Sequence, residues 1–298
     1  MALAILVFPT AAHAWAPLAH LSFSARALLE LESVPAPTRG LLGEYANEFL
    51  YGSLAADIVV GKNLTRYLYH CHNWRVGFNV HRAARPGGER AFALGFLAHL
   101  AADTVAHNYF VPYQAVGSFR HLHTRHAYWE LRYDQHMDRT LSRVARVVSG
   151  RAYRGHDELL RRTLKKASVL PFSISRGLFG SLLASASEPR FQALSRGLLA
   201  RPGRLPLQED LVEETGRLSV EAILGVLREG ERSEAARADA TGARNLRVAM
   251  RLRRALSARR PRLAGELAAA LSAEVRGAFR QSLSGPLRLP PPLVRLLA

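Results

Sequence analysis

The sequence predicts an all-α fold built as a multi-helix bundle. In most segments apolar residues recur every three or four positions, which is the spacing of one face of an α-helix. We find no segment with the strict alternation of apolar and polar residues that a half-buried strand needs. With 298 residues and 48% apolar content, the chain is long enough for one large or two ordinary domains with a substantial core.

Four helices are expected in the first half of the chain. The segment SFSARALLELE (22–32) opens on a serine and is followed by prolines, which are start and stop signals of a helix. Residues 39–58 form the second helical segment, and residues 125–148 form the fourth. The third, residues 87–110, ends near Pro112 and is apolar on most of its faces, so it belongs at the centre of a bundle.

From about residue 150 the segments become shorter, richer in Arg and Leu, and interrupted by prolines. Amphipathic helices are expected in DELLRRTLKKASVL, EDLVEETGRLSVEAILGVLREG and LAGELAAALSAEVRGAFRQSL, whereas the tail PLRLPPPLVRLLA is expected to be irregular. The formal net charge is +17, and 27 basic against 14 acidic residues lie beyond residue 150. A basic surface favours an anionic partner such as a membrane or nucleic acid, although a GC-rich genome gives the same excess of Arg. We therefore expect a helical domain over residues 15–150, and a basic Arg/Leu-rich helical region of open role over residues 151–298.

The first 14 residues have features of an export signal. MALAILVFPTAAHA contains a short apolar run, and Ala12-His13-Ala14 fits the A-x-A cleavage pattern, although no Lys or Arg precedes the apolar run. A signal of this kind would direct export to the periplasm or the medium, with cleavage after Ala14. Cys71 is the one cysteine of the chain, so an intramolecular disulfide is excluded.

Histidines gather in the first half of the chain, where they alternate with carboxylates at helical spacing. Ten of the twelve lie between His20 and His136. In HLAADTVAHNYF (99–110) two histidines and an aspartate follow one another at intervals of four, so they share one helix face. The next helix carries a similar pair four residues apart, His126 and Glu130 in HAYWE (126–130). Imidazole nitrogen and carboxylate oxygen suit zinc, and pairs on facing helices are a way in which bundles build multinuclear metal sites.

Further candidate ligands lie upstream of this helix. Asp57 closes an apolar helix, where a lone buried carboxylate is costly unless a cation or a donor compensates it. YHCHNW supplies His70, Cys71 and His72. These adjacent side chains cannot all point the same way on a helix, so one of them is expected to be a ligand. Trp15 and His20 would lie at the start of the mature chain.

This ordered set resembles the bacterial zinc-dependent phospholipase C family, whose fold is shared with the P1-type zinc nucleases. In that superfamily the mature chain begins with a tryptophan whose free α-amine and carbonyl bind zinc, and Trp15 would take that position. The resemblance covers about residues 15–140, favours His72 over His70, and implies three zinc ions. The implied ligands are Asp57, His72, His99 and Asp103 for one ion, His107, His126 and Glu130 for a second, and Trp15, His20 and Asp103 for a third, with Asp103 as the bridge.

The resemblance also implies an activity, the hydrolysis of phospholipids at the head-group phosphate by an exported zinc enzyme. Zinc lowers the pKa of bound water toward about 7 and so makes a nucleophile available at neutral pH. Asp57 is implied as the general base. Glu130 favours the phospholipase branch, because the nuclease branch typically has Asp there. One departure is that Asp103 and His107 lie closer together than in the best-known members.

Two other functions remain open on the sequence alone. A zinc nuclease of the same fold would use the basic C-terminal half to follow the backbone of single-stranded nucleic acid. A non-catalytic protein would use that half to bind an anionic membrane, and its metals would only stabilise the fold. The head group, the zinc occupancy and the oligomeric state are not determined by the sequence.

Overall fold

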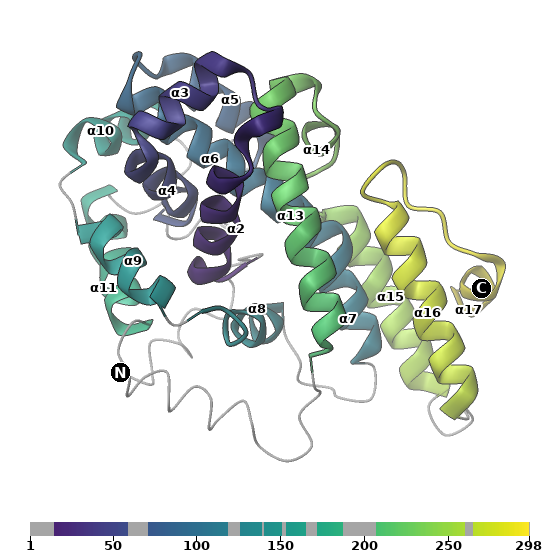
Figure 1. Ribbon diagram of the computed structural model, residues 1–298. Coiled ribbons are helices and arrows are strands. Elements are labelled where there is room, and N and C mark those ends of the chain that lie inside the picture. Colours follow the sequence, from purple (N-terminus) through teal and green to yellow (C-terminus); the bar gives the residue numbers. More distant parts are fainter. Residues whose placement is uncertain are drawn as a thin grey trace.

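The computed structural model describes residues 15–58, 71–118, 126–138, 140–150, 153–164, 172–186, 207–259 and 265–297. Throughout these ranges every regular element is a helix, which confirms the all-α prediction (Figure 1). The N-terminal half contains α2 (Pro17–Leu29), η1 (Leu31–Ser33), α3 (Ala36–Glu44), α4 (Ala46–Ala55), η2 (Ala56–Ile58), α5 (Trp74–Ala83), α6 (Gly88–Val105), the π-helix η5 (Ala106–Phe110), α7 (Val111–Gly117), α8 (His126–Asp134) and α9 (Thr140–Gly150).

The second half adds shorter helices and three long ones. Its elements are α10 (Arg154–Thr163), α11 (Phe172–Ala186), α13 (Glu209–Glu229), η6 (Gly230–Arg232), α14 (Glu234–Arg237), α15 (Ala243–Arg259), α16 (Gly265–Gln281) and α17 (Pro291–Leu297). In Figure 1, α13 stands between the N-terminal helices and the group formed by α15, α16 and α17. The expectation of an irregular tail is wrong in part, because PPLVRLL forms α17.

Two of the predicted helices are divided in the structure. Residues 39–58 form two helices separated at Tyr45, and residues 125–148 form two helices separated by the turn before Asp138. Asp138 explains the second start, because its carboxylate accepts a hydrogen bond from the backbone N–H of Thr140 at 2.8 Å. In both cases the apolar spacing continues across the break, so periodicity alone could not locate it.

The third predicted helix does not end near Pro112. It continues as the π-helix η5 and then α7, with Pro112 in the first turn of α7. Proline has no N–H and its ring clashes with the carbonyl four residues earlier, here that of Asn108, so a regular α-helix cannot pass through this point. The widened π turn is the local solution, and it begins immediately after the residues HLAADTV (99–105), so that His107 lies within it.

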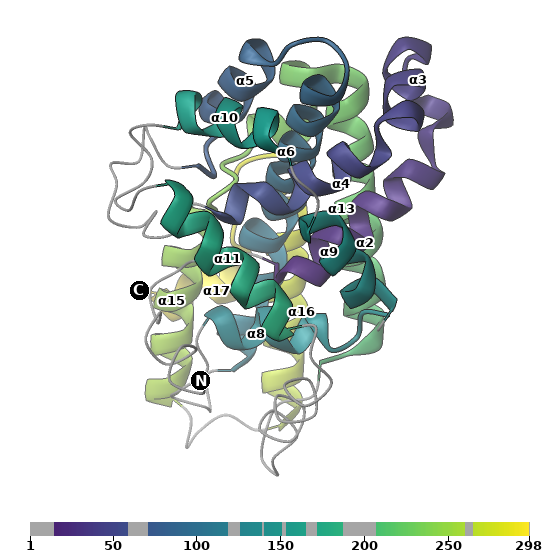
Figure 2. The same cartoon turned by 90° about the vertical axis from the view of Figure 1, so that its left-hand side faces the viewer.

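α6 is the central helix of the molecule. Almost every residue from Ala91 to Val105 is buried, including the polar ones. α4 and α13 are its main neighbours and α5 covers a further side (Figure 2). At the α4–α6 crossing Gly52 faces the carbonyl of Phe92 and Gly95 faces the carbonyl of Phe49, so the two backbones meet with no side chain between them.

An ion-pair network joins α13 and α16 to the π-helix. Glu214 of α13 accepts hydrogen bonds from Arg276 and from the hydroxyl of Tyr109, both at 2.7 Å, and pairs with Arg280 at 2.5 Å. Burial by itself would raise the pKa of Glu214, but the hydrogen bonds from Arg276 and Tyr109 and the arginine charges lower it below its usual value. The network therefore requires Glu214 to be ionised.

Glu214→Gln is expected to destabilise the protein by about 1 to 2 kcal/mol near pH 7, because it removes hydrogen bonds to a charged group. A carboxyl whose pKa is lowered on folding contributes stability above its unfolded pKa of about 4.3, and this contribution is lost as the pH falls through the folded value. Denaturant unfolding at pH 7 and pH 3 measures the difference, which should shrink at pH 3. Glu221→Gln is the control, because its pair with Arg217 is exposed within one helix and should change stability by less than about 0.5 kcal/mol. Equal losses for the two variants at both pH values would contradict the prediction.

Candidate metal centre

Five of the predicted ligands come from four separate segments and meet beside α6. All five are buried, with at most 5% of each residue exposed. α2 supplies one, the turn η2 a second, the turn before α5 a third, and α6 the remaining two; in chain order they are His20, Asp57, His72, His99 and Asp103.

Asp103 lies at the centre of this cluster. Its Oδ2 atom is 3.1 Å from Nε2 of His72 and 3.3 Å from Nε2 of His99. Its Oδ1 atom is 3.2 Å from Nε2 of His20. The two carboxylate oxygens thus face different histidines, as a carboxylate that bridges two ions must.

Asp57 approaches the cluster from the end of α4. Its Oδ1 atom is 3.3 Å from Nε2 of His72 and 4.0 Å from Nε2 of His99. Two overlapping groups of potential ligand atoms result, and within each group all the atoms lie within 4.8 Å of one another. One group joins His20, Asp57 and His99, and the other joins His72, His99 and Asp103.

The second ring nitrogen of two histidines is held by a neighbouring group. Nδ1 of His99 donates a hydrogen bond to the carbonyl oxygen of Ser53 at 2.8 Å, and Nδ1 of His72 lies 3.1 Å from Sγ of Cys71. These contacts direct Nε2 of each ring into the cluster, and the Ser53 carbonyl sets the tautomer of His99. His20 stacks on His99 with ring centroids 3.7 Å apart.

The electrostatics of the cluster keep a negative charge at its centre. Burial would raise the pKa of Asp103, but the nearby His99 and His72 hold it well below its usual range. Burial and the charge of His99 lower the pKa of His20. For His99 burial acts in the same direction, but Asp103 and Asp57 outweigh it and raise the pKa.

The cluster fits a zinc ion by its chemistry and its spacing. Ligand atoms of a tetrahedral zinc at about 2.0–2.1 Å lie about 3.3 Å from each other, close to the separations around Asp103. Both nitrogens of His20 and both carboxylate oxygens of Asp103 lack a hydrogen bond within the described part of the chain. The 3.2 Å contact between these two residues does not have hydrogen-bond geometry. Buried polar atoms rarely go without a partner, and a cation in the cluster would satisfy them.

Trp15 lies next to the same turn of α6. Its side chain is fully buried, and the indole Nε1 donates a hydrogen bond to the carbonyl oxygen of Ala102 at 2.9 Å. The ring packs against Tyr133 and Phe110, with centroids 4.2 and 4.8 Å away. The residue expected to begin the mature chain is therefore anchored beside Asp103, while the expected signal of residues 1–14 lies outside the described residues.

The second predicted ligand set is only partly described. His107 on the π-helix and Glu130 on α8 are both buried, with 2% and 3% exposed. Neither belongs to the two groups of ligand atoms found among the described residues. The side chain of His126 and the whole of His70 lie outside the described residues.

The structure brings a further aspartate, Asp134, to the start of α2. Its carboxylate accepts hydrogen bonds from the backbone N–H groups of Leu18 and Ala19 at 3.3 and 3.0 Å. It thereby caps the first turn of α2, the helix that carries His20. Burial, together with the charge of Glu130, raises the pKa of Asp134 to about 7, although the two hydrogen bonds by themselves lower it. Sequence spacing carries no signal of this contact, because the partners are about 115 residues apart.

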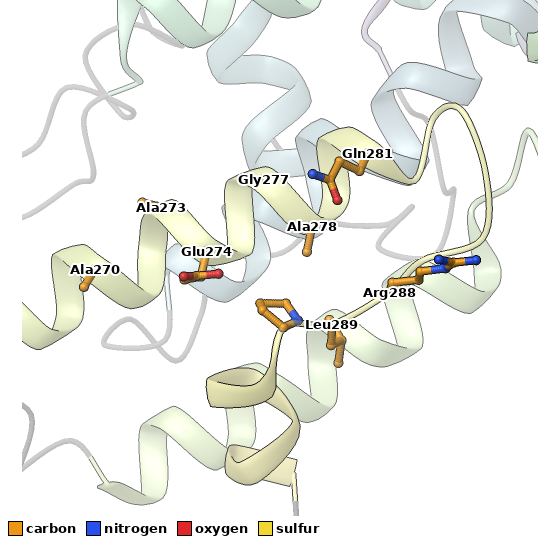
Figure 3. Close-up of a pocket in the computed structure, with 9 residues that line it drawn as sticks. Ala270, Ala273, Glu274, Gly277, Ala278, Gln281, Arg288 and Leu289 are labelled. Carbon is orange, nitrogen blue, oxygen red and sulfur yellow. The ribbon is translucent and has the colours of Figure 1, made fainter.

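A groove lies away from this cluster. It has a volume of about 700 Å³ and is lined by small residues of α16, by Glu274 and Gln281, and by Arg288 and its neighbours in the tail (Figure 3). Neither of the two groups of potential metal-ligand atoms found among the described residues lies in this groove.

Comparison with known proteins gives one finding. The family model described as zinc dependent phospholipase C matches residues 19–168, which is about half of the chain. The match includes four segments of the buried cluster and ends before α13. No curated protein and no solved structure matches the chain.

Proposed function

The chain belongs to the zinc-dependent phospholipase C family, and on that basis we propose that it hydrolyses phospholipids at the head-group phosphate by attack of an activated water. The observation that carries the proposal is the position of Asp103, fully buried and between three imidazoles, with Asp57 at the edge of the same cluster. A metal site that only stabilises the fold needs no second carboxylate, such as Asp57, beside the proposed bridging carboxylate of Asp103. A hydrolytic site needs one as a base.

We assign the residues to three zinc ions as the family implies. Bound zinc lowers the pKa of water and stabilises negative charge on phosphate oxygens. The proposed ligand sets are Asp57, His72, His99 and Asp103, then Trp15, His20 and Asp103, and finally His107, His126 and Glu130.

The side chains around these ligands hold them in place. Ser53 fixes the ring of His99 from behind, and Asp134 fixes the start of α2 and with it His20. Asp57 is assigned as the group that accepts the proton of the attacking water. Glu130 favours phospholipid over nucleic acid as substrate, as the family resemblance implies.

The proposed ligand role of Trp15 requires a free α-amine, so it is tied to cleavage after Ala14 and to export. Among the helices that the structure describes, none combines the length and the hydropathy needed to span a bilayer. The N-terminal sequence of the mature protein, purified from a cell that exports it, tests the cleavage site directly. A mature chain that begins anywhere but at Trp15 would remove this residue from the ligand set.

The activity is tested with phosphatidylcholine and phosphatidylinositol vesicles, from which we expect the release of phosphorylated head group. A chelator should abolish this release, and added zinc should restore it. Asp57→Asn is expected to lower kcat by about 10²- to 10⁴-fold, the range of general base catalysis. Asp138→Asn is the control, because Asp138 is exposed and caps α9. Single-stranded DNA is assayed on the same preparation. Turnover of DNA without turnover of any lipid, or wild-type activity in Asp57→Asn, would overturn the proposal.

A further inference from the structure

A turn in the second half of the chain, outside the family match, contacts two segments that carry proposed ligands. Three successive carbonyl oxygens of this turn, residues 238–242, accept hydrogen bonds. The Ala238 carbonyl accepts one from Nε1 of Trp74 at 2.9 Å, two residues after His72. The Asp239 carbonyl accepts one from Nδ2 of Asn108 at 2.8 Å, and the Ala240 carbonyl accepts one from Nδ1 of His107 at 2.6 Å.

The contact with His107 fixes which nitrogen carries the proton. The acceptor is the carbonyl oxygen of Ala240, which cannot donate, so Nδ1 of His107 holds the hydrogen. Nε2 is then the nitrogen with a lone pair to offer to a cation, the arrangement that most metal-binding histidines adopt.

The same region satisfies the backbone of the π-helix. Pro112 cannot donate to the carbonyl of Asn108, so this buried oxygen lacks its helical partner. Nδ2 of Asn245 donates to it instead at 3.1 Å, and Oγ of Ser282 lies 3.2 Å away. A side chain of α15 thus replaces the hydrogen bond that the proline removes.

The turn itself is held rigidly against His107. The carboxylate of Asp239 accepts hydrogen bonds from the N–H and hydroxyl of Thr241 and from the N–H of Ala243. Gly242 has a φ of +55°, and a Cβ atom there would lie 2.2 Å from the carbonyl oxygen of His107. Only glycine allows the turn to approach the π-helix this closely.

We propose that the 238–242 turn is a positioning element of the metal centre, which orients His107 through the Ala240 carbonyl and completes the site from outside residues 19–168. The inference rests on the proposed function, because it takes His107 to be a zinc ligand. It gives the second half of the chain a defined role at the site that the first half builds.

The test compares two glycines with nearly the same positive φ. Gly242→Ala meets His107, whereas Gly230→Ala, at a φ of +58°, has open space around it. Both variants carry the strain of a positive φ, so their difference isolates the contact. Zinc affinity by chelator competition is expected to fall about 10- to 100-fold at one site in Gly242→Ala alone, as for other groups that orient a ligand. The visible spectrum of the cobalt-substituted protein should change in the same variant.

Asn245→Ala is the second variant, and it keeps the test informative if Gly242→Ala does not fold. It removes a donor to the π-helix without adding an atom and should weaken zinc at the same site. Wild-type zinc affinity and cobalt spectrum in Asn245→Ala, or equal losses in the two glycine variants, would overturn the inference. If the wild-type protein turns over no lipid but Gly242→Ala still weakens its zinc binding, the proposed function is overturned and the present inference is not.

A separate observation concerns the outer face of α15. Arg244, Arg247, Arg251 and Arg254 are exposed and follow helical spacing, so they form one stripe about 15 Å long. α15 contains no acidic residue, and none of the four pairs with a carboxylate among the described residues. Met250, 42% exposed, lies beside the stripe.

We infer, independently of the catalytic proposal, that this stripe docks on an anionic phospholipid surface. Arginines attract anionic head groups, and an exposed aliphatic side chain among them can enter the interface. On the neighbouring α17, Val294 is also exposed, at 51%. Neither helix contains an aromatic residue on which bases could stack, which favours lipid over single-stranded nucleic acid.

Vesicle sedimentation with chelator present, so that no lipid is cleaved, tests this face. Vesicles with about one third phosphatidylglycerol are compared with pure phosphatidylcholine. Changing the four arginines of the stripe to Gln should weaken binding to anionic vesicles at least about 100-fold. The control changes four arginines that pair with carboxylates elsewhere, Arg82, Arg161, Arg217 and Arg228, and removes the same charge. Equal weakening by both sets, or binding of single-stranded DNA but not vesicles, would overturn the inference.

Discussion

Asp103→Asn is expected to release zinc from the buried cluster and to lower hydrolysis of phospholipid by more than about 100-fold. Groups that only orient a ligand cost about 10- to 100-fold in metal affinity, and Asp103 itself faces three imidazoles with its two oxygens. Asparagine keeps the shape but replaces one oxygen by an amide nitrogen, which is a poor zinc ligand and carries no charge. Zinc per chain by elemental analysis and the rate with phosphatidylcholine vesicles measure the two effects.

Asp57→Asn provides the comparison for this variant. It should lose activity while keeping more zinc than Asp103→Asn, because Asp57 lies at the edge of the cluster. Zinc content in Asp103→Asn equal to that of the wild type would contradict the assignment of Asp103 as a bridge. The helical far-ultraviolet signal is measured in both variants to show that each is folded.

Gly95→Ala is expected to destabilise the protein by about 3 kcal/mol or more, measured as the free energy of unfolding in denaturant. A Cβ atom at Gly95 would lie 2.0 Å from the carbonyl oxygen of Phe49 and 2.9 Å from the backbone nitrogen of Ser53. α4 and α6 must therefore move apart, and neither contact atom is a flexible side chain. Because α4 leads to Asp57 and α6 carries His99, the displacement should weaken zinc binding as well.

Gly43→Ala is the control for this substitution. Gly43 lies in α3 with no atom near its Cβ position, so alanine should raise stability by about 0.5 to 1 kcal/mol through helix propensity. A loss below about 1 kcal/mol in Gly95→Ala would show that the crossing relaxes easily and that it does not set the ligand geometry.

Five of the residues that the sequence predicts as ligands come together in the structure, and the sequence could indicate them because their signals are local. His99 and Asp103 share a helix face by their spacing of four, and this requires only helix geometry. Asp57 was indicated as a carboxylate that ends an apolar helix. Helix boundaries were harder, because apolar periodicity does not register the π-helix that Pro112 imposes or the break before Thr140.

Contacts between distant segments could not be predicted in this way. The cap of α2 by Asp134 joins residues about 115 positions apart, and the bond from His107 to Ala240 spans 133 positions. Such contacts depend on how whole helices pack, and neither spacing nor composition encodes the register of that packing.

By itself the sequence determined the all-α class and the buried central helix, and it indicated the histidines and carboxylates that we propose to hold zinc, because periodicity and residue chemistry act over a few positions. Only the tertiary structure decided how those residues are held. The glycine crossing of α4 and α6 sets their distances, and the 238–242 turn reaches the π-helix from the far half of the chain. Both depend on backbones that touch only after folding, and a buried cluster of like ligands is tolerable only where that packing holds every one of them in place.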